Sequence, residues 1–262
     1  MNKRRVAAAA VSLCLMAGAG PATAGSHLWR IAEIYSNADG TIQFIELREI
    51  GGSSDETRLE GRWFFTNNHY YVFPNDLVGD TTYGSFLMGT ETYAAQPGVP
   101  APDYVVPDNF FDPQGDTMVW FTYDTFDVVD GQVPVDGVHS LIRISLEQAV
   151  NTPVNFSGAN GRVLDPAADY DADGYLDPQD NCLLAANEPQ RDTDADGYGN
   201  RCDADLNNDG VVNFADVGAM KAVFFTANAD ADLDGDGAVS FADLGILKEG
   251  VFGAPGPSGL VP

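Results

Sequence analysis

The chain has 262 residues and a formal net charge of −26 at pH 7, because 39 acidic side chains outnumber 13 basic ones. A surface this acidic repels phosphate groups, so we expect no nucleic acid partner and no anionic membrane partner. The charge is uneven, since residues 165–262 hold 18 Asp, 2 Glu and 4 Lys or Arg, a net charge of −16. Crowded carboxylates oppose a compact state, so we expect this part to fold on binding metal.

Residues 1–24 have the layout of a secretory signal peptide. A basic cluster at 3–5 precedes an apolar run over 6–19, and Ala-Thr-Ala at 22–24 forms a cleavage site. A transmembrane helix is the alternative, but the run is short for a span. No later segment is long and apolar enough, so we expect a secreted, extracellular chain that begins at Gly25 and has no membrane span.

Residues 25–164 are rich in β-branched and aromatic residues and are interrupted by turn residues. Short runs of this kind predict strands, and residues 37–40 predict a hairpin turn between the first two. A helical turn is predicted over 146–151. The predicted strands are Leu28–Tyr35, Thr41–Ile50, Leu59–Thr66, Tyr70–Phe73, Ser85–Thr92, Thr117–Tyr123 and Val138–Ser145. The pattern favours a mainly β fold, with one β-sandwich over 25–164.

Few residues of the predicted sandwich suggest catalysis. Glu33 and Glu46 stand on neighbouring predicted strands, and glycoside hydrolysis uses paired carboxylates. Solvated or hydrogen-bonded strand residues are the alternative for this pair. The three histidines lack metal-ligand spacing, and no nucleophile elbow or phosphate-binding glycine loop is present. We therefore expect no catalytic residues and no enzyme activity.

Aromatic residues in 25–164 suggest a binding role instead. Trp63, Tyr70, Tyr71, Trp120 and Tyr123 could form a platform for sugars, because flat apolar rings with a polar edge suit pyranose faces. Packing in the core is the alternative for most of them.

The acidic part contains the pattern of a calcium-binding loop four times, over 169–180, 192–203, 205–216 and 232–243. Such a loop wraps Ca²⁺ with oxygens from positions 1, 3, 5, 7, 9 and 12, and Gly at position 6 permits the turn. The predicted side-chain ligands are Asp169, Asp171, Asp173, Asp177, Asp180, Asp192, Asp194, Asp196, Asn200, Asp203, Asp205, Asn207, Asp209, Asn213, Asp216, Asp232, Asp234, Asp236, Ser240 and Asp243. A disordered acidic tail is the alternative, but chance acidity would not place Gly at position 6 each time. We expect about four Ca²⁺ ions.

Two cysteines follow the predicted signal peptide, Cys182 and Cys202. An even number in an oxidising compartment predicts a disulfide between them. The bond would contribute about 3 kcal/mol in the chain-entropy account. A zinc site is the alternative, but two lone cysteines are too few ligands for it.

The stretch 204–252 contains an internal duplication with an offset of 27 residues. Each half has a calcium loop followed by a predicted helix, over 214–225 and 241–252, with apolar residues at helical spacing. The remaining residues, 253–262, are rich in Gly and Pro and predict a flexible tail.

Residues 169–203 resemble thrombospondin type 3 repeats. They carry the Asp-x-Asp-x-Asp-Gly-x-x-Asp-x-x-Asp-Asn-Cys signature of that family as Asp169 to Cys182, and Gly-Asn-Arg-Cys-Asp over 199–203 closes a second repeat. Leu183 and Asn200 depart from the family pattern. The resemblance implies calcium-binding repeats over 165–203 and the 182–202 disulfide.

Residues 204–252 resemble a dockerin domain, a small α-helical module of paired loop–helix units. The halves match in their position-12 Asp and in Lys221 and Lys248. The resemblance implies docking to a cohesin-like protein, often in polysaccharide-degrading assemblies. Positions 10 and 11, where dockerins carry recognition residues, are Phe214, Ala215, Phe241 and Ala242. The alternative is that both phenylalanines pack inside the domain.

The opening strands, with Ile-Ala-Glu-Ile at 31–34 and Phe-Ile-Glu-Leu at 44–47, are similar to those of bacterial lamin-tail-like domains. The resemblance implies an immunoglobulin-like sandwich used for binding or as an accessory module. We separately expect a polysaccharide or cell-surface ligand for residues 25–164. We expect a secreted, non-catalytic, calcium-binding modular protein with a β-sandwich binding module and a docking module. The alternative is a carbohydrate-binding or small hydrolytic accessory component of a polysaccharide-degrading system.

Overall fold

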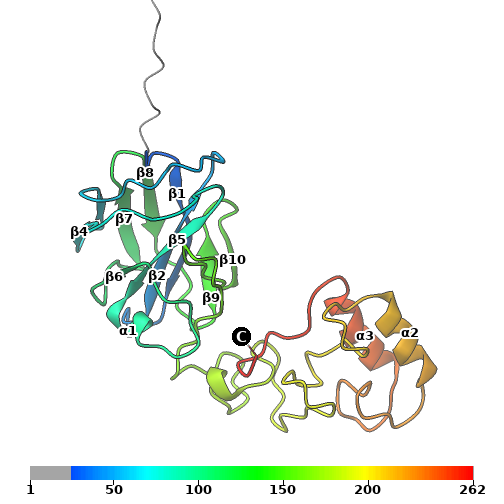
Figure 1. Cartoon of the computed structure of the whole chain (residues 1–262). Helices are drawn as coiled ribbons and strands as arrows, with labels where there is room; N and C mark the ends of the chain where they lie inside the picture. The colour runs from blue at the N-terminus through cyan, green and yellow to red at the C-terminus, as the bar shows by residue number, and fades with distance from the viewer. Residues whose placement is uncertain (1–24, 262) are drawn as a thin grey trace, which may run out of the picture.

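A computed structural model describes residues 25–261, so the predicted signal peptide lies outside the described residues. A β-rich region forms one end of the molecule, and a loop-rich region with two helices forms the other (Figure 1). Among the described helices, none is long and apolar enough to cross a membrane.

The β-rich region contains two sheets, here named sheet A and sheet B. Sheet A has the order β10–β9–β1–β2–β5–β6, and sheet B has the order β4–β3–β7–β8. Neighbouring strands are antiparallel except β5 and β6, which run parallel. Sheet A consists of β1 (Trp29–Ser36), β2 (Gln43–Glu49), β5 (Ser85–Thr90), β6 (Tyr104–Val106), β9 (His139–Ile142) and β10 (Glu147–Val150). Sheet B consists of β3 (Trp63–Phe65), β4 (Tyr70–Val72), β7 (Gly115–Trp120) and β8 (Asp124–Val129).

The two sheets enclose one hydrophobic core. Sheet A contributes Ile34 and Met88, and sheet B contributes Phe64, Met118 and Trp120, all with no exposed surface. These residues alternate with outward-facing neighbours along their strands, as the period of two of a β-strand requires. Each large apolar side chain buried in this way stabilises the fold by about 1.5–3 kcal/mol. The predicted sandwich is confirmed at the level of two sheets around a shared core.

Sheet A carries a second layer on its outer face. Tyr35 and Phe44 from the sheet are buried against Tyr93 of α1 (Glu91–Ala94) and against Val163. Three carboxylates of this face, those of Glu33, Glu46 and Asp103, each accept a backbone N–H from the segment 152–156 at 2.8–3.0 Å. The chain therefore covers this face with its own residues.

Each of the seven predicted strands is present, with somewhat different ends, but the helical turn predicted over 146–151 is wrong. Residues 147–150 form β10, which pairs antiparallel with β9 through a turn at Leu146, where φ is 55°. Cross-strand pairing overrides the weak local preference for helix here. The strands β6, β8 and β10 were not predicted from the sequence.

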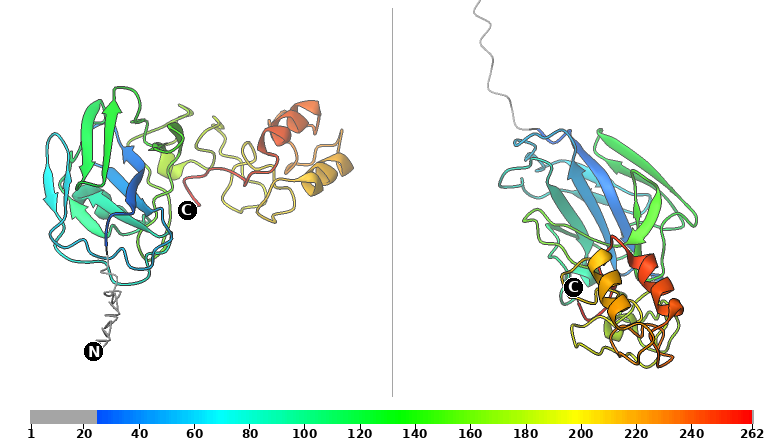
Figure 2. Two further views of the ribbon diagram at one scale, coloured as in Figure 1. Left: turned by 90° about the horizontal axis from the view of Figure 1, so that it is seen from above. Right: turned by 90° about the vertical axis from the view of Figure 1, so that its right-hand side faces the viewer.

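The loop-rich region has only short regular elements: the 3₁₀ turn η1 (Asp177–Gln179), α2 (Phe214–Ala222) and α3 (Phe241–Gly250). The two helices lie side by side in both views of Figure 2 and share a small core that contains Met220 and Leu247. Asn213 and Ser240 cap the helices, each in a capping box with the Asp three residues later. The predicted loop–helix duplication is therefore also a structural duplication.

The flexible tail predicted over 253–262 is not what the structure shows. Residues 253–261 run from α3 back along the loops towards the sandwich (Figure 1). The backbone N–H of Gly259 donates to the carbonyl of Asp180 at 2.7 Å, and the Arg162 side chain of the sandwich donates to the carbonyl of Ser258 at 2.6 Å. Ser258 has no exposed surface. The Gly and Pro content that suggested flexibility instead lets the backbone pass close to its neighbours.

The position of Gly259 generates a test. A Cβ at Gly259 would clash with the carbonyl oxygen of Asp177, so Gly259→Ala must displace the tail from the loops. We expect a lower melting temperature in calcium and faster proteolysis within 253–261. Gly245→Ala is the control, because a Cβ there meets no atom within 4 Å. Equal melting temperatures for Gly259→Ala and the wild type would contradict the docked tail.

Candidate calcium centre

The four predicted calcium loops share one backbone conformation. Each loop has a glycine with φ of 86–99° at position 6, and position 4 also has a positive φ, of 55–77°. The residues are Ala172 and Gly174, Ala195 and Gly197, Asn208 and Gly210, and Gly235 and Gly237. Left-handed φ values are uncommon outside glycine, so the same pair of them in four places is a specific signature. The sequence repeat is therefore a repeat of loop geometry.

Hydrogen bonds within each loop hold the carboxylates of positions 1 and 5. The N–H of the position-6 glycine donates to the position-1 Asp, with N–O distances of 2.6–3.1 Å in the four loops. The N–H of position 7 donates to the position-5 Asp at 2.8–3.1 Å. These hydrogen bonds orient the carboxylates of positions 1 and 5 within each loop.

Three of the four loops gather carboxylates close enough to share one cation. The ligand oxygens within each group lie within 4.8 Å of one another. The groups are Asp169 with Asp171 and Asp173, Asp192 with Asp194 and Asp196, and Asp232 with Asp234 and Asp243. The loop 205–216 does not form such a carboxylate group among the described residues, since Asn207 supplies an amide at position 3. The predicted ligands outside these groups are Asp177, Asp180, Asn200, Asp203, Asp205, Asn207, Asp209, Asn213, Asp216, Asp236 and Ser240.

Position 9 separates the first two loops from the last two. The side chains of Asp177 and Asn200 accept the N–H of position 2 in their own loops, at 2.8 and 2.9 Å. Asn213 and Ser240 instead cap α2 and α3. In the first two loops, position 9 therefore bonds back to the start of the same loop. In the last two loops, position 9 instead begins a helix.

Buried carboxylate oxygens without donors are the observation that fits a bound cation. Four such oxygens occur in the loops: Oδ1 of Asp169, Oδ2 of Asp171, Oδ2 of Asp177 and Oδ1 of Asp216. An unpaired buried anionic oxygen is costly, and a hard cation with six to eight oxygen ligands satisfies several at once. The donor set, which is all oxygen, suits Ca²⁺.

The electrostatics of the loops agree with this fit. Burial raises the pKa of Asp171 and of Asp177 from 3.8 to about 6, and that of Asp203 from 3.8 to about 7. Neighbouring carboxylates add to the increase, such as Asp180 beside Asp177. A nearby Ca²⁺ would favour the charged form and lower these pKa values.

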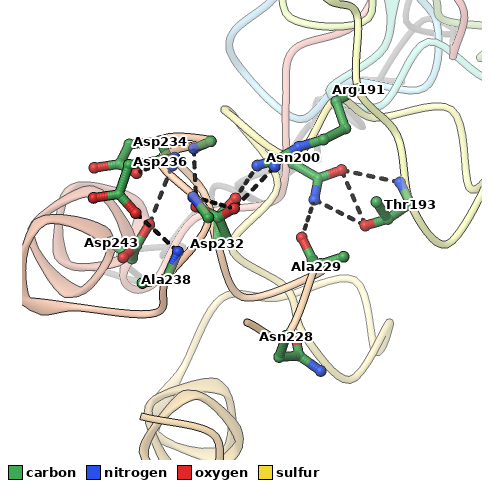
Figure 3. A network of polar contacts seen from close by, with 12 residues as sticks. Arg191, Thr193, Asn200, Asn228, Ala229, Asp232, Asp234, Asp236, Ala238 and Asp243 are labelled. Atoms are coloured by element: carbon green, nitrogen blue, oxygen red, sulfur yellow. Dashed lines mark hydrogen bonds and ion pairs between the residues drawn. The ribbon is translucent and has the colours of Figure 1, made fainter. Parts of the chain in front are cut away.

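A polar network joins the second loop to the fourth (Figure 3). The guanidinium of Arg191 donates to the Oδ2 of Asp232 at 3.0 Å, and the side chain of Asn200 donates to the carbonyl of Ala229 at 2.7 Å. Asn200 also accepts from Thr193 in its own loop. The segment 165–203 is therefore connected to the duplicated segment 204–252 by side chains as well as by the chain.

The predicted disulfide between Cys182 and Cys202 is present, with the two Cα atoms 5.6 Å apart. Beside it, the side-chain amide of Gln190 donates to Asp180 at 2.8 Å and to Asp173 at 3.1 Å. The disulfide connects the end of the first loop to the second loop, and the Gln190 amide attaches the segment between the two loops to the first.

The predicted docking residues all lie on the surface. Phe214 is 73% exposed and Phe241 is 72% exposed, and Ala215 and Ala242 beside them are also exposed. The alternative that both phenylalanines pack inside the domain is therefore wrong.

Sequence reasoning missed two further exposed phenylalanines, Phe225 and Phe252, which are 75% and 74% exposed. Both have a left-handed φ, of 62° and 72°, and the same offset of 27 residues relates them. The duplication is the signal that could have found them.

Comparisons with known proteins identify the repeats. The sequence profile of the thrombospondin type 3 repeat family matches residues 167–190 and 191–223. Thrombospondin-3 of Mus musculus is 39% identical over 89 residues, which is 29% of this chain and 9% of that protein. Thrombospondin-3 of Homo sapiens is 38% identical over the same length, and thrombospondin-3a of Danio rerio is 47% identical over 60 residues. No solved structure matches.

The chain therefore carries thrombospondin type 3 repeats in residues 167–223, and these make it a modular protein with calcium-binding loops. It spans only about a tenth of the length of the relatives that it matches. The second matched stretch crosses the predicted boundary at 203 and includes α2. The dockerin-like and lamin-tail-like resemblances lie outside what this match shows, and they stay predictions.

The raised pKa values predict how pH acts on the metal-free protein. A carboxyl with a raised pKa in the folded state stabilises the fold below its unfolded pKa near 3.8, and this contribution is lost as pH rises through about 6 for Asp177 and about 7 for Asp203. We expect the melting temperature of the acidic part in a chelator to fall between about pH 4 and about pH 7.

Calcium should reverse this trend, because Ca²⁺ binds the deprotonated carboxylates and protons compete with it. Thermal unfolding at each pH, with chelator and with millimolar calcium, measures both profiles. The same pH dependence under both conditions would contradict the assignment of these residues to a cation site.

Proposed function

We propose that this protein is a secreted, non-catalytic modular protein, in which calcium-binding repeats join a β-sandwich binding module to a dockerin-like docking module. The repeats supply the stiffness, because each bound cation would replace carboxylate repulsion with shared coordination. The disulfide between Cys182 and Cys202 suits an oxidising, extracellular compartment. Extracellular calcium modules work with affinities of about 10⁻⁴–10⁻³ M.

The exposed phenylalanines are the single observation that carries the docking role. Phe214 packs edge-on against Phe252 with ring centroids 5.7 Å apart, and Phe241 packs against Phe225 at 6.1 Å. Each pair joins one residue from each half of the duplication, so the module presents two equivalent aromatic patches. Exposed aromatic residues are the usual anchors of protein interfaces.

Backbone strain supports the same role. A bulky residue with a left-handed φ costs about 1–3 kcal/mol, and such strain concentrates at functional sites. Phe225 and Phe252 both have a left-handed φ, and about three-quarters of each side chain is exposed. Burial in the core therefore does not offset the strain. A cavity of about 210 Å³ beside Phe241 is lined by apolar residues and by Lys221. We propose that a cohesin-like protein inserts an apolar side chain there.

The alternative of a hydrolytic enzyme has less support. Glu33 accepts hydrogen bonds from Ser140 at 2.6 Å and from the N–H of Thr152 at 2.8 Å, and it is 4% exposed. Glu46 is fully buried and accepts from Ser85 and from the N–H of Val154. The two buried carboxylates are engaged by the covering segment 152–156, so the proposal assigns them no catalytic role.

The docking proposal predicts redundancy. Phe214→Ala or Phe241→Ala alone should weaken partner binding modestly, because the second patch remains, and the double variant should abolish it. The side chains are exposed, so folding and calcium binding should persist in all three variants. Affinity capture from the secreted fraction of the source, with calcium and with chelator, measures retention of the partner.

Val78→Ala is the control variant, since this side chain is 92% exposed and belongs to the sandwich. A partner that the double variant retains as well as the wild type would contradict the docking surface. Unfolding of the module by a single substitution would show that these residues support the fold instead.

A further inference from the structure

The C-terminal tail contacts three parts of the molecule that lie far apart in the sequence. Its residues 256–260 bond to the first calcium loop, to the second calcium loop and to the sandwich. Ordering a segment that is rich in Gly costs more conformational entropy than ordering most others, so several contacts are needed to offset this cost. The tail is therefore a connecting element between these three parts.

On the side of the repeats, the tail bonds to backbone groups of the calcium loops. The N–H of Gly259 donates to the carbonyl of Asp180, which is position 12 of the first loop, at 2.7 Å. The hydroxyl of Ser258 donates to the carbonyl of Gly197, which is position 6 of the second loop, also at 2.7 Å. These carbonyls converge on the tail only when both loops have their folded shape. Docking of the tail therefore depends on the state of the loops.

On the side of the sandwich, the tail is held by a buried arginine. The guanidinium of Arg162 donates to the carbonyl of Ser258 at 2.6 Å, and its Nε has no partner among the described residues. Arg143 of the same module pairs with Asp124, whereas no carboxylate in residues 25–261 pairs with Arg162. A buried charge is costly unless hydrogen bonds or a counter-charge replace its water. The tail carbonyl is the polar partner that the described chain provides for this group.

A ligand residue of the first calcium loop lies between the tail and the sandwich. The carbonyl of Asp177 faces Gly259 of the tail, and its Oδ2 lies near Gly137 of the sandwich. The rings of His139 in the sandwich and Tyr170 in the first loop also lie 5.0 Å apart. The sandwich thus meets the first loop directly and meets the tail as a second point of attachment.

The joint between the tail and the sandwich has one polar link and a cavity. The cavity, of about 420 Å³, is lined by residues 96–99 of the sandwich and by residues 258–261 of the tail. Within residues 25–261, the bond from Arg162 is the hydrogen bond that crosses this joint. A body attached at one place can turn about it, and a second attachment fixes its angle. Arg162 is therefore placed to fix the angle of the sandwich.

We propose that the C-terminal tail is a clamp that fixes the orientation of the sandwich relative to the calcium-loaded repeats. The folded loops hold the tail, and the tail holds Arg162 and with it the sandwich. Coupling between binding events is reciprocal, so a tail that docks on the loaded loops also raises their affinity for calcium. The clamp rests on calcium binding by the loops. It is separate from the proposed docking role, because residues 256–261 include none of the exposed phenylalanines.

A chain that ends at Pro255 tests the clamp, because it lacks these contacts but keeps both helices and all four calcium loops. Small-angle X-ray scattering of the mature protein in calcium measures the distribution of distances within the molecule. We expect a broader distribution for the shortened chain than for the wild type, because the sandwich can then turn about its contact with the first loop. Arg162→Ala should broaden the distribution in the same way, although the whole tail is present.

Calorimetric titration of the same samples with Ca²⁺ gives the second readout. The shortened chain should bind as many ions as the wild type, with the affinity of the sites in the first two loops lowered about fivefold, at the lower end of usual coupling between sites. Arg162→Ala should lower the affinity less, because the bonds from the tail to the loops remain.

Arg58→Ala is the matched control, since it removes the same charge from an exposed side chain of the sandwich. The clamp is overturned if the shortened chain in calcium keeps the distance distribution of the wild type, or if its calcium affinity is unchanged. If the shortened chain does not fold, a wild-type distribution for folded Arg162→Ala overturns it instead. A wild type that binds no calcium would contradict the calcium-binding repeats as well, whereas failure of partner capture concerns the docking role alone.

Discussion

Repulsion among carboxylates is the constraint on which the C-terminal half of this protein depends. Its loops place three acidic groups within 4.8 Å of one another in three separate places. Burial raises the pKa values of Asp171, Asp177 and Asp203 in the loops, and four buried carboxylate oxygens of the loops have no donor. Ca²⁺ resolves the conflict because it takes several oxygens at once and brings two positive charges to each site. Once this repulsion is offset, the small apolar core around Met220 and Leu247 can be sufficient to hold the two helices together.

The modules are connected by side-chain and backbone contacts as well as by the chain itself. Arg191 of the second repeat pairs with Asp232 of the fourth loop, and the disulfide links the first two loops. The C-terminal residues return along the repeats and meet Arg162 at the base of the sandwich. Cation binding in any loop is thus coupled to the position of its neighbours. The sandwich and the helices α2 and α3 lie at opposite ends of this connected frame (Figure 1).

Features that are set by local residue spacing were predicted well from the sequence, whereas features that depend on pairing or packing with other segments were not. The calcium loops follow from residue spacing alone, because a 12-residue loop contains nearly all its ligands. The strands over 124–129 and 147–150 each form a hairpin with the strand just before them, and their register with that strand is not encoded by their own composition. The docked tail was missed because its partners lie up to 96 residues away. The exposure of Phe225 was not predicted, because it depends on a left-handed turn after α2.

Hydrogen–deuterium exchange of the mature chain, with and without calcium, tests the central claim most directly. The account predicts that the amides of 165–252 exchange fast in chelator and gain strong protection when calcium is added. The strands of the sandwich, with their own core, should show the same protection in both conditions. Equal protection of 165–252 with and without calcium would contradict the claim that cation binding orders this half of the protein.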